Sequence, residues 1–156
     1  MAMFSVIFVF VLGFLTFTGA TDSSSIEYFS SLNGNCVLVG QWENQLGSTL
    51  EIDRCQNGFL SGKYSSKVGV AKYYYELTGR YTVDINTGTN YMLGFSVAWN
   101  NDKFGNSQST TSWTGIYYAS ENVIRTHWIL TRFLLPSMYW EANHIGHDDF
   151  KRTTNS

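Results

Sequence analysis

Short runs of alternating or clustered hydrophobic residues follow one another along most of the chain, and turn-forming residues such as Asn57-Gly58 and Glu121-Asn122 separate them. No segment combines the length and the 3.6-residue period of an amphipathic helix, and only residues 134–143 are compatible with a helical turn. The pattern therefore predicts an all-β protein with eight strands. The predicted strands cover residues 37–44, 48–55, 58–66, 72–83, 90–99, 109–118, 123–132 and 145–153.

Residues 92–99 show the clearest alternation. Leu93, Phe95, Val97 and Trp99 share one face of the predicted strand, and small uncharged residues share the other. Because neither face carries a charge, we expect protein to cover both, which suggests a contact between subunits. The connections between consecutive strands are short, whereas a Greek-key sandwich needs at least one long crossover. The fold class predicted is thus an eight-stranded antiparallel up-and-down β-barrel.

The first 20 residues differ from the rest because they carry no charge. The apolar run from Phe4 to Phe17 precedes the small residues Thr18-Gly19-Ala20, as in a secretory signal peptide with its cleavage site. A membrane anchor is the alternative, although a run of about 14 residues is short for a bilayer core that needs roughly 20. We therefore expect a secreted, extracellular protein. Its predicted parts are a signal peptide at 1–20, a polar leader at 21–35, a barrel domain at 36–153 and a tail at 154–156.

Composition and charge narrow the class of protein further. The 156 residues are 44% hydrophobic, 17% aromatic and 14% charged, a balance opposite to that of disordered chains. There are 10 Lys and Arg residues against 12 Asp and Glu residues, the net charge is −2, and no basic run is present. Nucleic acid is therefore not an expected partner. After residue 20 no segment has the length and apolarity of a membrane span, so we expect no membrane partner either.

The chain has two cysteines, Cys36 and Cys55. In an oxidising compartment such a pair forms a disulfide more often than it stays reduced. The two cysteines flank a predicted hairpin with its turn near residues 45–47, and arms of equal length set them opposite each other. A bridge that closes this loop contributes roughly 3 kcal/mol. Two free thiols, or a bridge between chains, are the alternatives.

Several predicted strands place polar and aromatic residues on one face, since side chains of equal parity in a strand point the same way. A structural core would use aliphatic residues there, because a buried hydroxyl without a partner costs roughly 1–3 kcal/mol. Polar groups beside aromatic rings are typical of a ligand cavity. Any single tryptophan is nevertheless more often a core residue, so parity alone leaves both interpretations open. The sets are Trp42 with Asn44, Tyr64 with Ser66, Ser109 with Thr111 and Trp113, and Trp128 with Leu130.

The order of these residues resembles the avidin and streptavidin family of biotin-binding proteins. Any one motif is weak, but together they span residues 36–153 with spacing close to that of the family. The resemblance implies the eight-stranded barrel already expected, holding one small ligand. The motifs are residues 40–48 (GQWENQLGS), 58–64 (GFLSGKY), 77–81 (LTGRY), 93–99 (LGFSVAW), 109–115 (STTSWTG), 126–130 (THWIL), Trp140 and 146–148 (GHD).

The family resemblance also implies a biotin site and a role for each matching residue. Asn44, Ser48 and Tyr64 would donate hydrogen bonds to the urea oxygen of biotin, and Ser66 and Asp148 would accept them from its two N–H groups. Charge then builds up on the urea oxygen, which strengthens the hydrogen bonds there. The other implied contacts are Thr111 at the ring sulfur, Ser109 at the carboxylate tail, Leu46 in the first turn, Val68 and Gly69 in the closing loop, and Trp99, Trp113, Trp128 and Leu130 as walls.

The same resemblance implies a homo-oligomer, most often a tetramer, because Trp140 would cap the site of a neighbouring subunit. Chicken-type avidins carry a cysteine in the sixth strand where this chain has Tyr117, so the bridge between Cys36 and Cys55 would replace theirs. No cofactor or metal is implied, and biotin is the bound ligand. The biological role implied by the family is sequestration of biotin by a secreted protein.

Two other classes of function compete with this interpretation. An enzyme would use histidines and carboxylates near the last strand, where His144 and His147 offer a spacing of three, a weak metal signal without a third ligand. No glycine-rich phosphate loop or nucleophile arrangement supports catalysis, so we expect no enzyme. The other alternative is an avidin-like barrel without biotin that acts as an extracellular oligomerisation module. Retention of the complete polar set argues against that alternative.

Overall fold

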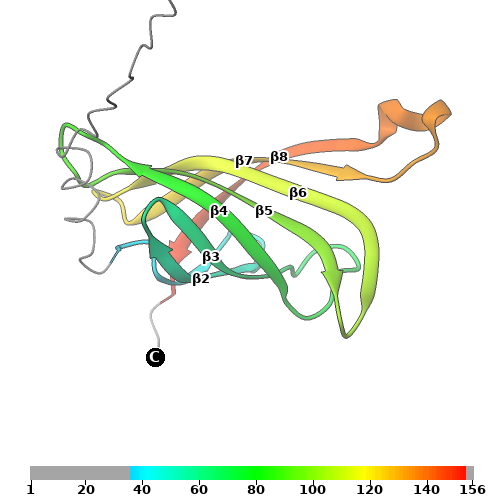
Figure 1. Cartoon of the computed structure of the whole chain (residues 1–156), viewed down its shortest axis with the longest axis horizontal. Helices are drawn as coiled ribbons and strands as arrows, with labels where there is room; N and C mark the ends of the chain where they lie inside the picture. Colours follow the sequence, from blue (N-terminus) through cyan, green and yellow to red (C-terminus); the bar gives the residue numbers. More distant parts are fainter. Residues whose placement is uncertain (1–35, 154–156) are drawn as a thin grey trace, which may run out of the picture.

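Antiparallel strands follow one another around a closed barrel, each paired with its neighbours in sequence, and the last strand returns to pair with the first (Figure 1). The computed structural model describes residues 36–153. A 3-10 helix, η1 (Pro136–Glu141), stands in the predicted helical-turn segment. The fold class is thus confirmed. The strands are β1 (Gly40–Glu43), β2 (Thr49–Gln56), β3 (Phe59–Ser65), β4 (Tyr75–Val83), β5 (Tyr91–Asn101), β6 (Gly105–Tyr118), β7 (Val123–Arg132) and β8 (Asn143–Arg152).

The predicted division of the chain into segments is not tested by the structure. The barrel strands run from Gly40 to Arg152 within the described residues, and the predicted signal peptide at 1–20, leader at 21–35 and tail at 154–156 lie outside them. Within the described residues, no helix is both long and apolar enough to span a bilayer. These segment predictions therefore stay predictions.

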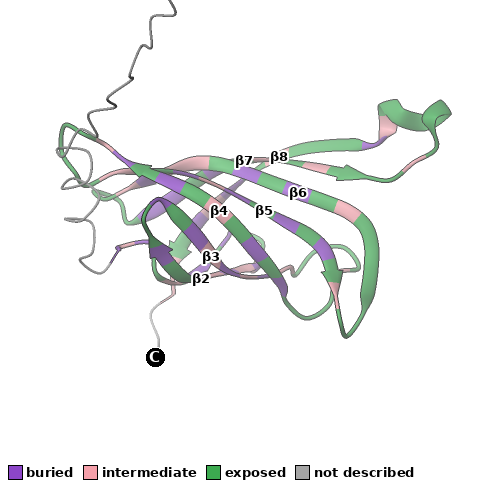
Figure 2. Ribbon diagram, viewed as in Figure 1, coloured by how far each residue is buried: buried purple, intermediate pink, exposed green. Residues whose placement is uncertain are grey.

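Strand alternation builds the core. Figure 2 shows buried and exposed residues succeeding each other along the strands, so one side of each strand faces the barrel interior. Along β5 the alternation matches the prediction, because Leu93, Phe95, Val97 and Trp99 are all buried. Burial of a large apolar side chain contributes roughly 1.5–3 kcal/mol. The most deeply buried large side chains are Trp42, Phe150, Leu38, Leu50, Ile52, Leu77 and Ile124.

Residues predicted to form turns do so in the structure. Asn57 and Gly58 connect β2 to β3 with φ angles of 53° and 76°. A two-residue type I′ hairpin turn requires positive φ at both of these positions. Asn122, before β7, has a φ of 52°. Asn tolerates this left-handed region better than most residues because its short polar side chain bonds locally. The turn chemistry therefore fixes where these hairpins reverse.

The hairpin between β5 and β6 is longer than predicted. We expected strands at 90–99 and 109–118, but β5 continues to Asn101 and β6 begins at Gly105. The pairing register shifts between Ala98 and Asn100, and this bulge bends the strand without ending it. The Asn101 side chain then accepts hydrogen bonds from the amides of residues 103 and 104 at 3.1 and 2.7 Å. The extension was not predicted because the mostly polar residues 100–108 show no hydrophobic alternation.

A disulfide joins Cys36 to Cys55, with 5.8 Å between the two Cα atoms. The prediction of an intrachain bridge is confirmed, and the alternatives of free thiols and an interchain bridge are excluded for this structure. The first strand is shorter than predicted, since β1 begins at Gly40 after a turn in which the Val39 amide donates to the Cys36 carbonyl at 3.0 Å. The bridge therefore ties this turn, rather than a strand, to the end of β2.

Candidate functional site

The carboxylate of Asp148, on the inner face of β8, is the centre of a buried polar cluster. Asp148 is 3% exposed. The Asn44 amide donates to its Oδ1 atom at 2.8 Å, and the Trp113 indole N–H donates to its Oδ2 atom at 2.8 Å. Burial raises the pKa of the Asp148 carboxyl, and the hydrogen bonds from Trp113 and Asn44 oppose that rise. Since both oxygens accept hydrogen bonds, the geometry fits the ionised form.

The turn between β1 and β2 holds Asn44 in place. Its Oδ1 atom accepts the backbone N–H groups of Ser48 at 2.8 Å and Leu46 at 3.0 Å, so the side chain acts as a local cap of the turn. The amide nitrogen has two hydrogens, and one of them is used by Asp148. The other is available to a ligand.

Tyr64 and Ser48 lie in the same interior. Tyr64 is 3% exposed and Ser48 is fully buried. Burial, and then the charge of Asp148, raise the pKa of the Tyr64 phenol above its ordinary value, while a hydrogen bond with Ser48 opposes this. Tyr64 therefore stays a hydrogen-bond donor. The Ser48 oxygen accepts the Lys67 amide at 3.0 Å, so the hydroxyl proton of Ser48 can point inward.

Aromatic rings surround the polar cluster. The Tyr64 ring lies 4.9 Å from the Trp113 ring and 5.8 Å from the Trp99 ring between centroids, and both indoles are buried. Trp128 and Leu130, from β7, are half-buried and pack against the core. The interior is thus lined by indoles on several sides.

Thr111 and Ser109, on β6, line the side of the site next to Trp99. The Trp99 indole N–H donates to the Thr111 hydroxyl oxygen at 2.7 Å, and Thr111 is buried. Ser109 is half-buried and shares a hydrogen bond of 2.9 Å with Ser107, whose hydroxyl also donates to the Trp99 carbonyl. Both residues face the predicted side, and both already bond within the protein.

The segment between β3 and β4 is organised by Ser66. Its hydroxyl donates to the Val68 carbonyl at 3.0 Å and accepts the Val68 amide at 3.2 Å. Val68 and Gly69 are exposed, and Gly69 adopts a positive φ of 71°. Leu46, in the first turn, is 54% exposed. These members of the predicted set therefore lie at the rim and not in the buried cluster.

Trp140 is far from this cluster within its own chain. It belongs to η1, and Figure 1 shows η1 at the outer end of β7 and β8, projecting away from the rest of the barrel. Its side chain is 79% exposed. The structure therefore does not bring Trp140 to the site in a single chain.

Three residues of the site were missed by the sequence analysis. The Gln45 amide donates to the His147 carbonyl at 3.1 Å and accepts the Asp149 amide at 3.0 Å, which ties the first turn to β8. Phe95 stacks on Trp113 with 5.0 Å between ring centroids. Gly146 lies under Trp128, since a Cβ atom there would come within 2.3 Å of that indole. The alternation of residues 92–99 predicts that Phe95 is buried. The contacts of Gln45 and Gly146 depend on how β8 aligns with its neighbours, which the sequence does not show.

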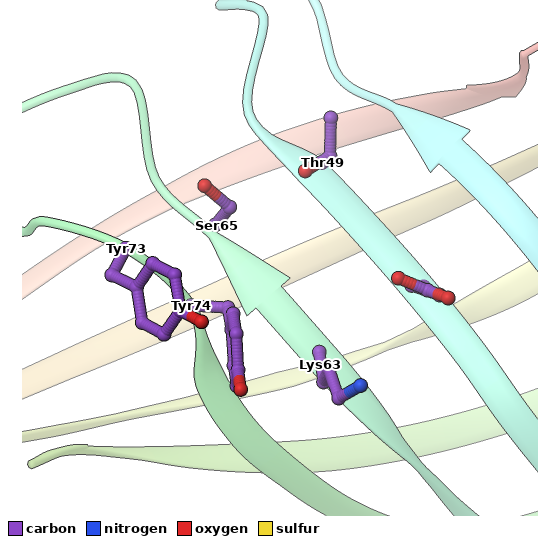
Figure 3. Close-up of a pocket in the computed structure, with 6 residues that line it drawn as sticks. Thr49, Lys63, Ser65, Tyr73 and Tyr74 are labelled. Carbon is purple, nitrogen blue, oxygen red and sulfur yellow. The ribbon is translucent and has the colours of Figure 1, made fainter. Parts of the chain in front are cut away.

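A separate cavity of about 290 Å³ lies on the outside of the barrel. Figure 3 shows Tyr73 and Tyr74 beside the outward side chains of β2 and β3. In β2 and β3 these positions alternate with the buried residues Leu50 and Tyr64, so the cavity and the buried cluster are on opposite faces of the same sheet. The lining residues are Thr49, Glu51, Lys63, Ser65, Tyr73 and Tyr74.

The two histidines considered for a metal site do not face each other. His144 and His147 are three residues apart on β8, so they project from opposite faces of the strand. Strand geometry therefore gives no common ligand position to this pair, whose spacing was only a weak metal signal in the sequence. Within residues 36–153 no group of three or more His, Cys, Asp or Glu side chains is placed to hold a metal ion.

Comparison with known proteins shows what this barrel is similar to. A family model described as "Avidin family" matches residues 32–153. The chain is 32% identical to "Avidin" of Gallus gallus over 124 residues, which cover 76% of this chain and 72% of that protein. It is 30% identical to "Avidin-related protein 4/5" of Gallus gallus over 122 residues, or 75% of this chain and 78% of that protein. It is also 29% identical to "Fibropellin-1" of Strongylocentrotus purpuratus over 126 residues, or 79% of this chain and 11% of that protein.

Proposed function

The chain belongs to the avidin family, and on that premise we propose that it binds biotin inside the barrel and acts as a secreted, biotin-sequestering protein. Members of this family are binding proteins, so the proposal involves no catalysis and no cofactor. The observation that carries it is the buried cluster in which Asn44 and Trp113 hold both oxygens of Asp148. A purely structural core has no need of such a cluster, because burial of a carboxylate is costly.

The urea group of biotin matches the donors and acceptors that the cluster leaves open. The second amide hydrogen of Asn44 and the hydroxyl protons of Ser48 and Tyr64 would all donate to the urea oxygen. Asp148 would accept from one urea N–H, and Ser66, at the rim beside the cluster, would accept from the other. Three donors on one carbonyl oxygen and a carboxylate opposite favour a polarised urea, which strengthens each hydrogen bond.

The remaining parts of biotin would contact the walls and the rim. Trp99, Trp113, Trp128 and Leu130 would enclose the fused rings, and Thr111 would reach the sulfur. Ser109, Leu46 and the Val68-Gly69 backbone would lie near the carboxylate tail. Thr111 accepts the Trp99 indole N–H and keeps its own hydroxyl proton to donate, whereas Ser109 would turn its hydroxyl proton from Ser107 to the carboxylate.

We also propose that the functional unit is a homotetramer. Trp140 would then reach the site of a neighbouring subunit, which agrees with its 79% exposure on the projecting η1 helix. The outer face of β5 and β6 supports the same proposal because it carries small, uncharged residues such as Ser96 and Ser112, which bond to each other at 2.7 Å. An uncharged face of this kind suits contact with another subunit.

A structural module without biotin is the second candidate. The similarity to fibropellin-1 supports it, since the matched barrel makes up 11% of that protein and related barrels therefore occur inside much longer chains. The polar set distinguishes the two candidates. A structural barrel gains nothing from keeping Asn44, Ser48, Tyr64 and Asp148 together, so biotin binding is the proposal that we favour.

Calorimetric titration of the purified protein with biotin tests the proposal directly. We expect a dissociation constant below 1 μM, about −8 kcal/mol or better. Biotin should also raise the melting temperature, because a ligand at 1,000 times its dissociation constant stabilises the folded state by about 4 kcal/mol. Absence of heat and of any thermal shift at millimolar biotin would rule out biotin binding and leave the structural module.

A further inference from the structure

Two imidazoles face each other on the outer surface of the barrel. His127 on β7 and His147 on β8 are register partners in the antiparallel ladder. Their ring centroids are 6.4 Å apart with an angle of 50° between the ring planes. Both residues are exposed, and among the residues that the structure describes neither imidazole takes part in a hydrogen bond or an ion pair. The ring nitrogens are therefore free to bind a ligand.

Opposed positions on neighbouring strands let both rings reach one point, because their Cβ atoms lie about 4.5–5.5 Å apart. Imidazole is a preferred ligand of zinc, copper and nickel ions. With bonds of about 2.0–2.1 Å, two imidazoles on one tetrahedral ion have ring centroids roughly 5 Å apart. The observed 6.4 Å closes to this value by small side-chain rotations, which exposed rings make freely.

The surroundings do not oppose a cation. Arg125, the neighbouring position on the same face of β7, is held by Glu121 at 2.5 Å and lies 3.9 Å from the Asp149 carboxylate. Its charge is thus offset by two acidic groups. On the other side the partners are Ile129 and Ile145, both exposed and uncharged. Among the described residues of this face, no cation therefore stands unopposed beside the histidine pair.

We propose that His127 and His147 form a chelating site for a divalent transition-metal ion on the outer face of the barrel. Two protein ligands fill half of a tetrahedral shell, and water occupies the remaining positions. Copper(II) should bind most tightly, since divalent ions follow a general order of affinity that peaks at copper. Metal ions bind the neutral form of the imidazole ring, so protons compete with the metal for both ligands.

His144 provides a matched control within the same strand. It projects from the opposite face of β8 to His147, and its register partner is Leu130. Removal of His144 therefore deletes one histidine and leaves the proposed pair intact. A nonspecific association of copper with surface histidines would not distinguish His144 from His147.

The test is titration of the full-length protein with Cu²⁺ at pH 7.5, followed by calorimetry and electron paramagnetic resonance. We expect a spectrum with coupling to two imidazole nitrogens. The variants His127→Ala and His147→Ala should each weaken binding at least tenfold, whereas His144→Ala should keep the wild-type affinity. The double variant His127→Ala/His147→Ala measures binding elsewhere, for example at the amino terminus.

Several outcomes would overturn the proposal. These are no Cu²⁺ binding at 100 μM, equal loss in His144→Ala and His147→Ala, or wild-type affinity in the double variant. Circular dichroism of each variant shows whether it is folded, so a loss of binding is not mistaken for a loss of structure. The measurement is made without biotin and does not depend on the proposed biotin site.

Discussion

Asp148 and Asp149 are consecutive residues of β8 with identical side chains, yet they belong to different chemical environments. Asp148 faces inward, is 3% exposed and accepts two hydrogen bonds of 2.8 Å. The Asp149 side chain faces outward, is 46% exposed and has Arg125 at 3.9 Å as its ion-pair partner. Exposed ion pairs contribute little, commonly below about 1 kcal/mol. Position in the strand, and not residue type, therefore decides which carboxylate can recognise a ligand.

The same contrast holds on β7. His127 is exposed on the outside, and Trp128, the next residue, packs against the core. The two faces of this pair of strands thus support two separate proposals, biotin inside and a metal ion outside. Substitutions that act on one face alone test whether the faces are independent.

The largest effect is expected from removing the inner carboxylate. Asp148→Ala should weaken biotin binding by about 3 kcal/mol, or about 150-fold, because a buried urea N–H loses a charged acceptor. Asp149→Ala is the matched control and should change the affinity by less than about 0.5 kcal/mol. Calorimetry on both variants measures the difference. Equal effects of the two substitutions would show that Asp148 is not part of the site.

A methyl group added to the inner face of β8 should have the next largest effect. A Cβ atom at Gly146 would lie 2.3 Å from the Trp128 indole, so Gly146→Ala must displace that ring. We expect a loss of about 1–3 kcal/mol in the free energy of unfolding, measured in denaturant without biotin. Gly94→Ala, on the outer face of β5, would meet only the Trp113 carbonyl at 3.3 Å and should cost less than about 1 kcal/mol. A larger loss at Gly94 would contradict the assignment of faces.

The smallest expected effect is on how the free energy of unfolding depends on pH. Burial raises the pKa of Asp148 in the folded state above its unfolded value. Between these two pKa values the folded protein binds more protons than the unfolded chain, so the free energy of unfolding falls as the pH rises through that window. Asp148→Asn removes this dependence.

Relative to Asp148→Asn, the wild type should therefore lose stability from about pH 4 upward and then reach a plateau. Asp149→Asn makes the same change in net charge on the outer face and serves as the control. Denaturant unfolding across the pH range, without biotin, gives the curves. A wild type that gains stability over the variant as the pH rises would show that Asp148 is stabilised as a carboxylate.

The strands were predictable because both the alternation and the turns are local. Leu93 to Trp99 shows its buried face in the sequence, and Asn57-Gly58 shows its turn. Parity also placed Tyr64 and Trp113 each on a strand face with polar residues, and the structure sets their ring centroids 4.9 Å apart. The fold thus depends on information carried by single strands, whereas the roles of the site residues were implied by the family resemblance.

Features that depend on how strands are aligned were not predictable. The spacing of His144 and His147 was only a weak metal signal, whereas the alignment of β7 with β8 pairs His127 with His147. A shift of one residue would have turned every side chain to the other face. Gln45 is a similar case, because its hydrogen bonds to His147, Asp148 and Asp149 cross about a hundred residues of sequence and have no local signal.

The seam between the first and last strands has a consequence for the ligand. Only Trp42 and Glu43 of β1 pair with β8 in the ladder. Backbone pairing therefore holds this joint together less than it holds strand pairs with longer ladders. Asn44 and Asp148 stand on either side of it. A ligand that binds both residues would link the first and last strands across this joint. Backbone amides along the seam should then exchange with solvent more slowly.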